Sequence, residues 1–418
     1  MKFKLFLRLL IILFAICLSQ KAMANKDGFQ SHPLFQENNI NTIEFWFKDD
    51  SLWDKMASEY RLKTKNYFKV KCIVNGEEFG STGIRFKGKH SYLFAWTDKK
   101  PLKVKLNEFE DQSYHGITKF NLANSFEDPS FQRDIQSLQI LSEMGVPAPM
   151  ASYAKVFLNG EYFGLYILIE QLDEAFLKRS FNEDSGPLFE SEGFCPGDGM
   201  YFSLELKENK KNYHRNELLE FIQFCRDSDE IRFFTELESR LNIDAFLKAC
   251  AVDVYLGNLD SYVWGRCHNF YLYFDSTRKA HWIAWDYNLS FGYDFKYERF
   301  YPIGLDRNMV LRRILTKEKY LKQYWTAIEY VSNLTSTRRF VRNVKETSRM
   351  IKSAVENDPN KFYSMDTFNI SLKNKVLGGL STNIPGILEF TRARRIQWQA
   401  YKKEEDIILE CKNKKGLN

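Results

Sequence analysis

The chain has 418 residues, of which 44% are hydrophobic and 16% aromatic, so it contains enough apolar material for a sizeable core. This length exceeds one typical domain, although a single two-lobed unit of the same size also fits. No low-complexity tract or internal repeat is visible, which excludes a disordered protein and a repeat protein. The formal net charge is +6, from 60 basic and 54 acidic residues.

Residues 1–24 predict a secretory signal. Basic residues open the chain, the apolar run LLIILFAICL follows, and Ala22-Met23-Ala24 provides a small-x-small cleavage site. The apolar run is short for a membrane span, with an uncleaved anchor as the alternative. We therefore expect an exported protein, in a periplasmic, cell-surface or extracellular location, without stable membrane insertion after the signal is removed.

Cleavage of this signal changes the charge of the protein. The signal contains four of the basic residues and no acidic residue, which leaves 56 basic against 54 acidic residues and a net charge of +2. This balance gives no support to a nucleic-acid partner. Six cysteines follow the signal without the close spacing of a zinc site, and either disulfides or buried thiols fit an oxidising compartment.

Two hairpins are predicted in the first 170 residues. A strand at 43–47 and a helix over 52–60 come first, and then two extended runs flank Asn75-Gly76. A second pair of runs flanks Asn159-Gly160 over 151–170. The helix that follows it starts at the capping residue Asp173.

Cations and small residues follow the first hairpin. They are Arg85, Lys87, Gly88 and Ser91. A glycine lets backbone N–H groups approach an anion, so this loop is a candidate for covering phosphates, with a solvated basic strand as the alternative.

Residues 101–106 alternate between apolar and basic side chains. This pattern places Lys103 and Lys105 on one face of a strand, where they are either phosphate-holding lysines or solvated surface residues. Asp128-Pro129 predicts the start of a helix that ends at Gly145. Asp134 and Glu143 are its candidates for pairing with the strand lysine, and the sequence does not decide between them.

The densest group of polar signals lies between residues 253 and 292. A helix that starts at Asn242 or Asp244 ends at Gly257, and Asp260 follows in a turn. Asn269 opens the strand-like run FYLYF, and Asp286 follows the apolar run WIAW. One carboxylate to orient a hydroxyl, with an Asn and a second Asp to hold Mg²⁺, is the set that phosphoryl transfer needs. Asp and Asn are also common turn formers, so spacing alone leaves a purely structural role open.

The segments NLDSY, HNFYLYF and WIAWDYNLSFG resemble the CotH family of atypical protein kinases. Further upstream, GIRFKGKHS is similar to the glycine-containing loop of that family, and NGEYFGLYILIEQLDEAFL to its hairpin and following helix. The resemblance extends from about Ile43 to about Asp294. Asn288 departs from the usual second Asp, and KGKH at 87–90 replaces an Arg-Gly-Asn-Ser-like loop.

This resemblance implies an α+β, two-lobed, atypical protein-kinase-like fold. A small β-rich lobe over 40–170 would bind nucleotide, and a larger helical lobe over 171–418 would carry an inserted loop at about 182–213. ATP and Mg²⁺ would bind between the lobes, with the phosphates held by Lys103 and the metal by Asn269 and Asp286. Asp260 would position a Ser or Thr hydroxyl of a protein substrate, and Glu170 or one of its neighbours would bond the ribose.

Two other functions fit the same residues. An enzyme with this fold could transfer AMP or another group instead of phosphate, and the mass of the modified protein would separate the two reactions. A non-catalytic surface or coat assembly scaffold is the second alternative. The presence of Asp260, Asn269 and Asp286 argues against a scaffold, and Mg²⁺-dependent nucleotide binding would test it.

Overall fold

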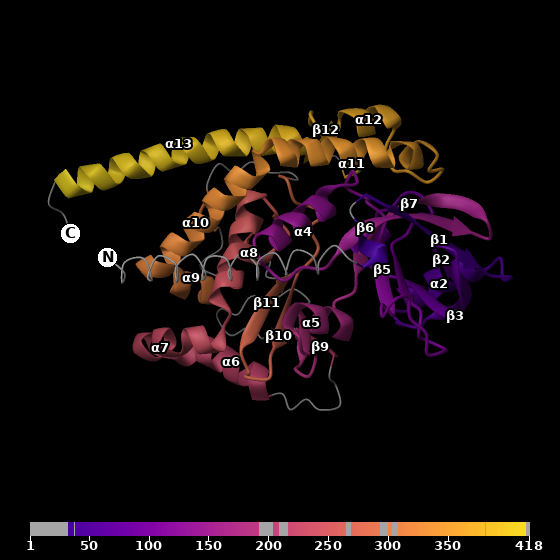
Figure 1. Ribbon diagram of the computed structural model, residues 1–418, viewed down its shortest axis with the longest axis horizontal. Helices are drawn as coiled ribbons and strands as arrows, with labels where there is room; N and C mark the ends of the chain where they lie inside the picture. Colours follow the sequence, from indigo (N-terminus) through magenta and orange to yellow (C-terminus); the bar gives the residue numbers. More distant parts are fainter. Residues whose placement is uncertain are drawn as a thin grey trace, which may run out of the picture.

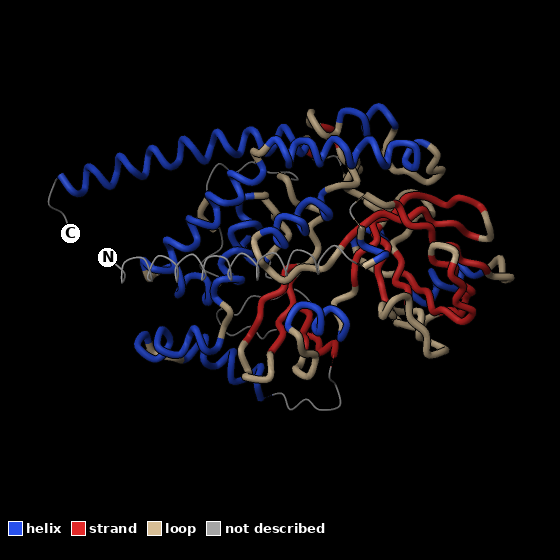
Figure 2. Tube along the Cα trace, viewed as in Figure 1, coloured by secondary structure: helices blue, strands red, loops and turns tan. Residues whose placement is uncertain are grey.

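The computed structural model describes residues 32–36, 38–191, 204–208, 216–264, 269–292, 300–302, 308–380 and 382–414. It has an α+β fold, which confirms the predicted class, and Figures 1 and 2 show a strand-rich end and a mainly helical end. The predicted signal lies outside the described residues. Among the described residues, no helix combines the length and the apolar character needed to cross a bilayer.

Seven strands at one end of the molecule close into a barrel. They are β1 (Ile40–Trp46), β2 (Phe68–Val74), β3 (Glu77–Phe86), β4 (Leu102–Lys105), β5 (Lys119–Ala123), β6 (Ala151–Leu158) and β7 (Glu161–Glu170). Their order is β1-β2-β3-β4-β5-β7-β6, and the parallel pairing of β6 with β1 closes the barrel. Alternate side chains point inward and form a separate hydrophobic core that includes Phe45, Val74 and Phe120.

Both predicted hairpins are confirmed. Asn75 and Gly76 connect β2 to β3 with φ angles of 50° and 90°, and Asn159 and Gly160 connect β6 to β7 with 49° and 87°. Two-residue turns of this kind need positive φ at both positions, which Asn and Gly adopt most easily. Short helices lie beside the barrel: η1 (Pro33–Phe35), α2 (Leu52–Arg61) and α3 (His90–Leu93).

A second sheet has four strands in the order β11-β10-β8-β9. The strands are β8 (Leu188–Ser191), β9 (Leu204–Glu208), β10 (Phe270–Phe274) and β11 (Ala280–Ala284). The prediction of an inserted loop over 182–213 is therefore wrong for the described part of that range. The glycines and prolines around β8 and β9 are typical of a loop, but two short strands form here. Strand β8 pairs with the buried strand β10, and β9 pairs with β8.

The rest of the described chain is mainly helical, and α8 lies at its centre. The helices are α4 (Arg133–Glu143), α5 (Glu174–Phe181), α6 (Asn216–Asp227), α7 (Glu230–Arg240), α8 (Ile243–Tyr255), η2 (Tyr262–Trp264), α9 (Met309–Leu315), α10 (Glu318–Thr335), α11 (Arg338–Glu356), α12 (Met365–Ile370) and α13 (Ile387–Lys414). A small hairpin of β12 (Val376–Leu377) and β13 (Asn383–Ile384) precedes α13. Helix α8 packs against α10 and β11, and its start is the cap Asn242 rather than Asp244.

Helix α4 begins four residues after the predicted start. Asp128 and Pro129 form a turn instead, and Phe131 takes a positive φ of 57° with its ring buried. The carboxylate of Asp128 then accepts a hydrogen bond from the N–H of Arg133, 2.8 Å away, at the first turn of the helix. Because the helix starts later than predicted, Arg133 and Asp134 lie at its N-terminus, where both side chains are buried.

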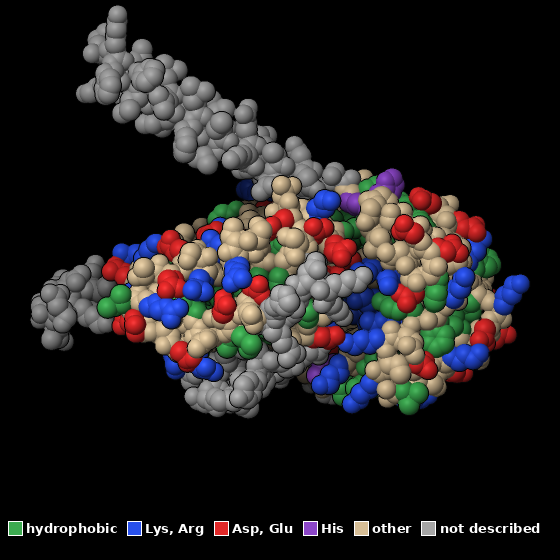
Figure 3. Space-filling view, turned by 90° about the horizontal axis from the view of Figure 1, so that it is seen from below, with side chains coloured by type: hydrophobic (Ala, Val, Ile, Leu, Met, Phe, Trp, Pro, Cys, Tyr) green, Lys and Arg blue, Asp and Glu red, His purple; other side chains and the backbone are tan. Residues whose placement is uncertain are grey.

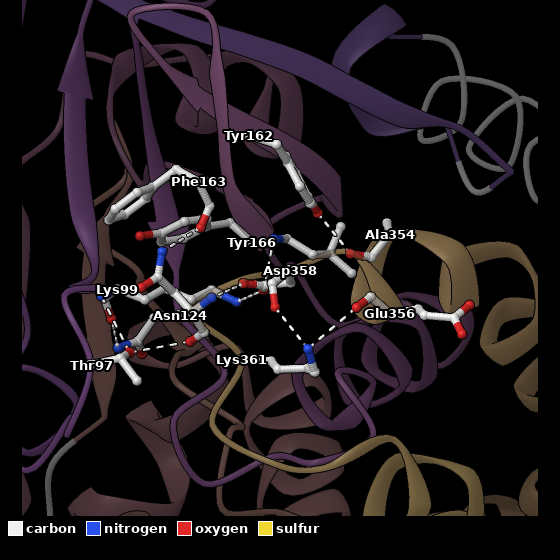
Figure 4. Close-up of polar contacts among 12 residues, drawn as sticks. Thr97, Lys99, Asn124, Tyr162, Phe163, Tyr166, Ala354, Glu356, Asp358 and Lys361 are labelled. Atoms are coloured by element: carbon white, nitrogen blue, oxygen red, sulfur yellow. Dashed lines mark hydrogen bonds and ion pairs between the residues drawn. The ribbon is translucent and has the colours of Figure 1, made fainter.

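A buried ion pair joins the C-terminal helices to the barrel (Figure 4). Lys99 Nζ lies 2.5 Å from Asp358 Oδ2, and neither side chain is exposed. Asp358, which follows α11, also accepts a hydrogen bond from the N–H of Leu165 in β7 at 3.0 Å. The side chain of Asn124 donates to the carbonyls of Lys99 and Ser91, so the same cluster also fixes the segment after β3.

Candidate functional site

The predicted residue Asp260 is half-buried in the turn that follows α8. Gly257 ends the helix with a φ of 59°, and Asn258 then donates from its side chain to the carboxylate of Asp253 at 3.1 Å. Ser261 donates to the carbonyl of Asn258 at 2.8 Å, which closes the turn. Burial raises the pKa of Asp253 to about 7. These contacts fix the backbone of Asp260 from both sides.

Arg394 supports the same turn from α13. Its guanidinium donates to the carbonyls of Val254 and Tyr255, at 3.0 and 3.1 Å, in the last turn of α8. The side chain is almost completely buried and stacks 3.8 Å from the ring centroid of Phe300. A cation at the C-terminus of a helix satisfies carbonyls that have no partner within the helix and interacts favourably with the helix dipole.

Asn269 and Asp286 lie at the same open end of the β10–β11 hairpin. The N–H of Trp285 donates to the carbonyl of Asn269 at 3.1 Å, which extends the ladder by one pair. Asn269 and Asp286 both have a φ of 61°, in the left-handed region that residues other than glycine rarely occupy. Strained positions of this kind concentrate at functional sites.

The side chain of Asn269 connects the hairpin to the turn after α8. Its amide nitrogen lies 2.6 Å from the carbonyl oxygen of Asp260 and 3.2 Å from its carboxylate. The structure therefore brings Asp260 and Asn269 together, with Asp286 two residues beyond the last strand pair. Both contacts use the amide nitrogen of Asn269, so its amide oxygen is the atom that a cation would use.

Helix α4 holds the segment after Asp286. The carboxylate of Asp134 accepts a hydrogen bond from the N–H of Tyr287 at 2.9 Å, and Ser137 pairs with Ser290 at 2.8 Å between hydroxyl oxygens. Burial, together with the nearby charge of Asp286, raises the pKa of Asp134. Of the two predicted acids of this helix, Asp134 faces the site, whereas Glu143 lies at the other end beside Arg339.

Lys87, which follows β3 of the barrel, interacts with Asp286 and Asp134, and Arg85 and Lys103 lie beside Lys87. Lys87 Nζ lies 5.3 Å from the ring centroid of Trp285, the residue before Asp286. Arg85 lies opposite Lys103 in the antiparallel pairing of β3 with β4. Burial lowers the pKa of Lys87, while the Asp286 carboxylate raises it. Burial and the neighbouring charges of Lys87 and Arg85 lower the pKa of Lys103 to about 7. Figure 3 shows basic side chains gathered where the barrel meets the helical part.

The loop after β3 is held close to these cations. Gly88 has a φ of 76°, and a Cβ at this position would lie 2.5 Å from the hydroxyl of Ser91, so the turn requires glycine. The hydroxyl of Tyr60 donates to the carbonyl of Gly88 at 2.7 Å. Gly88 and Ser91 thus lie together beside Lys87, as the sequence pattern suggested.

Two predicted residues do not join this group. Lys105 is paired with Glu108 at 2.5 Å, on the same strand as Lys103 but away from the acids. Glu170 is 1% exposed, 2.6 Å from Arg179, and accepts a hydrogen bond from the N–H of Met150. The burial and the ion pair of this carboxylate argue against the expected ribose contact of Glu170.

Sequence reasoning missed Glu190 and Asp253. Glu190 forms a close ion pair with Lys207, accepts a hydrogen bond from Tyr271 at 2.6 Å, and its charge raises the pKa of Lys103. Its only sequence signal is an acid within a short apolar run, in a range that we read as a loop. Asp253 interrupts the apolar surface of α8, and that interruption could have identified it.

The oxygen donors fit a magnesium ion better than a transition metal. Among the described residues, no three His, Cys, Asp or Glu side chains form a group that could hold a metal. Magnesium needs only one or two protein oxygen ligands and takes the rest from phosphates and water. The amide oxygen of Asn269 and the carboxylate of Asp286 match that requirement.

Comparison with known proteins identifies the family of this chain. The family model described as CotH kinase protein matches residues 84–396, which include Lys87, Lys103, Asp260, Asn269 and Asp286. The chain belongs to this family. The resemblance drawn from the sequence motifs is thereby confirmed.

Two curated proteins illustrate the CotH relationship. The chain is 27% identical over 265 residues to the inner spore coat protein H of Bacillus subtilis, covering 59% of this chain and 69% of that protein. It is 25% identical over 239 residues to the invasin CotH2 of Rhizopus delemar, covering 50% of this chain and 40% of that protein. The match therefore spans well under half of the fungal relative.

Proposed function

We propose that this CotH protein is an exported kinase that transfers the γ-phosphate of ATP to a Ser or Thr of a protein substrate. The observation that carries the proposal is the convergence of Asp260 and Asn269, beside Asp286, with the cation Lys87 close enough to interact with Asp286 and Lys103 next to Lys87. Acids on one side and cations on the other match the needs of an anionic nucleotide and its metal. The family description, CotH kinase protein, supports the same reaction class.

In this proposal the barrel is the nucleotide-binding lobe and the helical part is the catalytic lobe. The phosphates would lie against Lys87, Lys103 and the loop at Gly88, where burial strengthens the attraction between charges. Asn269 and Asp286 would hold Mg²⁺, which would neutralise phosphate charge when bound.

Asp260 would act on the acceptor side. Its carboxylate is anchored by the turn after α8 and by Asn269, so it can accept a hydrogen bond from a Ser or Thr hydroxyl in a fixed direction. Most of the catalytic effect would then come from positioning and from charge stabilisation.

Export to the cell surface or beyond follows from the predicted signal. The names of the two relatives, a spore coat protein and an invasin, support a surface location. We expect exported protein to begin at Asn25, and N-terminal sequencing of secreted material would test this. Recovery of only the uncleaved chain, from the cytosol, would contradict it.

The kinase activity can be tested with Asp260→Asn. This change keeps the shape of the side chain but removes its charge and basicity, so transfer of labelled γ-phosphate should fall by ~10²-fold or more, the scale for acid–base groups. ATP binding should survive. Asp244→Asn, at an exposed position of α8, the helix that precedes the turn of Asp260, is the matched control and should leave transfer unchanged.

The outcomes separate the candidate functions. Wild-type transfer by Asp260→Asn would remove this residue from the mechanism. Loss of binding together with transfer would reassign it to the nucleotide or metal. A product with the mass of AMP would replace phosphorylation by nucleotide transfer, and the absence of Mg²⁺-dependent ATP binding would leave a scaffold.

A further inference from the structure

Helix α11 carries a row of five basic residues on one face. Their spacing of four, three, four and three residues places them within a narrow strip along the helix: Arg338, Arg342, Lys345, Arg349 and Lys352. All five are exposed. At about 1.5 Å per residue the row is about 21 Å long. We call this set the α11 basic row.

The α11 basic row faces away from the protein. Phe340, Val344, Ile351 and Val355 form the opposite side of the helix and are buried. Figure 1 shows α11 along an outer edge of the molecule. The row is therefore presented to solvent on a rigid, well-packed helix.

None of the five cations has an ion pair or side-chain hydrogen bond within the described part of the chain. Other exposed helices of this protein compensate their charges at four-residue spacing, as in Arg232–Glu236 at 2.9 Å, Asp244–Lys248 at 2.7 Å and Glu318–Lys322 at 2.5 Å. Like charges at the same spacing disfavour a helix. Glu346 and Glu356 follow Arg342 and Lys352 at the same spacing but form no ion pair with them in the described structure, so the row is free to contact an external anionic group.

The row is separate from the candidate catalytic site. Helix α4 lies between them: Gln139 accepts a hydrogen bond from Asn343 of α11 at 3.2 Å, whereas Asp134 on the opposite face of α4 holds Tyr287. The inference that follows therefore does not depend on the proposed kinase activity.

We propose that the α11 basic row binds an extended acidic segment of another protein. Five cations without partners in a single line complement a chain of carboxylates, and an extended segment of about six residues spans about 21 Å. An anionic membrane fits less well. None of the large hydrophobic side chains exposed in the described residues belongs to α11, whereas helices that bind membranes insert such side chains.

The test uses charge reversal within the row. A fluorescent peptide of alternating glutamate and serine is titrated with the full-length protein, and anisotropy reports binding at low salt and at ~0.15 M salt. The variant combines Arg342→Glu, Lys345→Glu and Arg349→Glu. Reversing three attractive contacts should weaken binding by roughly tenfold or more, and wild-type affinity should fall as salt rises.

A matched control variant changes the net charge by the same amount at positions outside α11. It combines substitutions at three exposed lysines with no ion pair in the described structure: Lys48→Glu, Lys63→Glu and Lys178→Glu. Its affinity should stay within about twofold of wild type, because contacts beyond a Debye length of about 8 Å are screened. Circular dichroism checks the fold. If the reversed variant does not fold, glutamine at the same three row positions replaces it and should still weaken binding.

Three results would overturn the proposal. Unchanged peptide binding by the row variant would show that the row is not the binding surface. Equal loss of peptide affinity in the row variant and the control variant would show that binding depends only on the net charge of the protein. Row-dependent binding of vesicles of phosphatidylcholine and phosphatidylglycerol, without binding of the peptide, would assign the row to a membrane instead.

Discussion

Removing one partner of the buried pair between Lys99 and Asp358 should destabilise the protein strongly. Neither side chain is exposed, and the Lys99 ammonium lies 5.0 Å from the ring centroid of Phe131 and 5.3 Å from that of Tyr166. No water can replace the lost partner in such a setting without repacking. The test variant is Asp358→Asn, which keeps the size of the side chain and an oxygen that can accept from Leu165.

The magnitude follows from the charge left behind. Breaking a buried pair by removing one member costs about 3–5 kcal/mol. The loss in the free energy of unfolding has an upper limit, because Lys99 can lose its proton instead. Deprotonating an ordinary lysine at pH 7 costs about 4.6 kcal/mol. We therefore expect Asp358→Asn to lower the free energy of unfolding by about 3–4.5 kcal/mol at neutral pH.

The pH dependence has a definite sign. Burial already lowers the pKa of Lys99 from its ordinary 10.5, and the Asp358 carboxylate opposes that shift. Without the carboxylate, the folded state holds the lysine proton less tightly than the unfolded state, so folding stability rises with pH up to about 10.5. The loss relative to wild type should shrink by up to about 1.4 kcal/mol per pH unit between pH 7 and pH 9.

Two further variants make this reasoning refutable. Lys99→Met added to Asp358→Asn removes the stranded charge and should recover most of the loss, because an apolar replacement of a buried pair is often neutral. Asp49→Asn breaks an exposed pair with Lys55 and should change stability little. Denaturant unfolding at pH 7 and pH 9 gives the values. A loss below about 1 kcal/mol, or a double variant as unstable as the sum of its parts, would refute the argument.

Two predictions concern the candidate site. Asp286→Asn should weaken Mg²⁺-dependent ATP binding, because it removes charge from a site for a hard cation, and unchanged affinity in calorimetry at saturating Mg²⁺ would contradict that role. Lys103 has a pKa lowered to about 7, so it is mostly neutral above that pH in the free protein. ATP binding should then take up a proton between pH 7 and 9 and weaken as pH rises, whereas Lys103→Met should show no uptake. Calorimetry in buffers of different ionisation enthalpy measures the uptake, and its absence in wild type would exclude Lys103 from the phosphate contact.

The parts of the fold that sequence predicted are those that local chemistry determines. The Asn75-Gly76 and Asn159-Gly160 turns need positive φ at two successive residues, and few other pairs provide it. Asp173 and Asn242 begin helices because their side chains accept hydrogen bonds from the first turn. These signals lie within a few residues of the feature that they determine.

The parts that sequence did not predict depend on residues far apart in the chain. Strand β9 pairs with β8, and β8 pairs with β10, where Glu190 lies opposite Tyr271, about eighty residues later in the chain. Glu170 is enclosed by Arg179 of the following helix and by the N–H of Met150, which comes before β6 in the chain. An acidic residue such as Asp134 is normally on the surface, so nothing in its local sequence marks it as buried.

The candidate site consists of two groups that belong to different parts of the molecule. Asp260, Asn269 and Asp286 belong to the turn after α8 and to the β10–β11 hairpin, which the side chain of Asn269 connects. Lys87 belongs to the loop that follows β3, and Lys103 belongs to β4. The distance between the acids and the cations therefore depends on how the barrel is held against the helices.

The buried cluster around Lys99 helps to determine that distance. Asp358 connects the end of α11 to Lys99 (Figure 4) and to the N–H of Leu165 in the barrel. The side chain of Asn124 donates hydrogen bonds to the carbonyls of Lys99 and Ser91. Weakening the pair should thus shift the loop after β3 relative to the acids as well as lower stability. In conditions where Asp358→Asn remains folded, we expect its ATP affinity to fall while Lys99→Met/Asp358→Asn recovers. Equal ATP affinity in wild type and both variants would limit the pair to a role in stability.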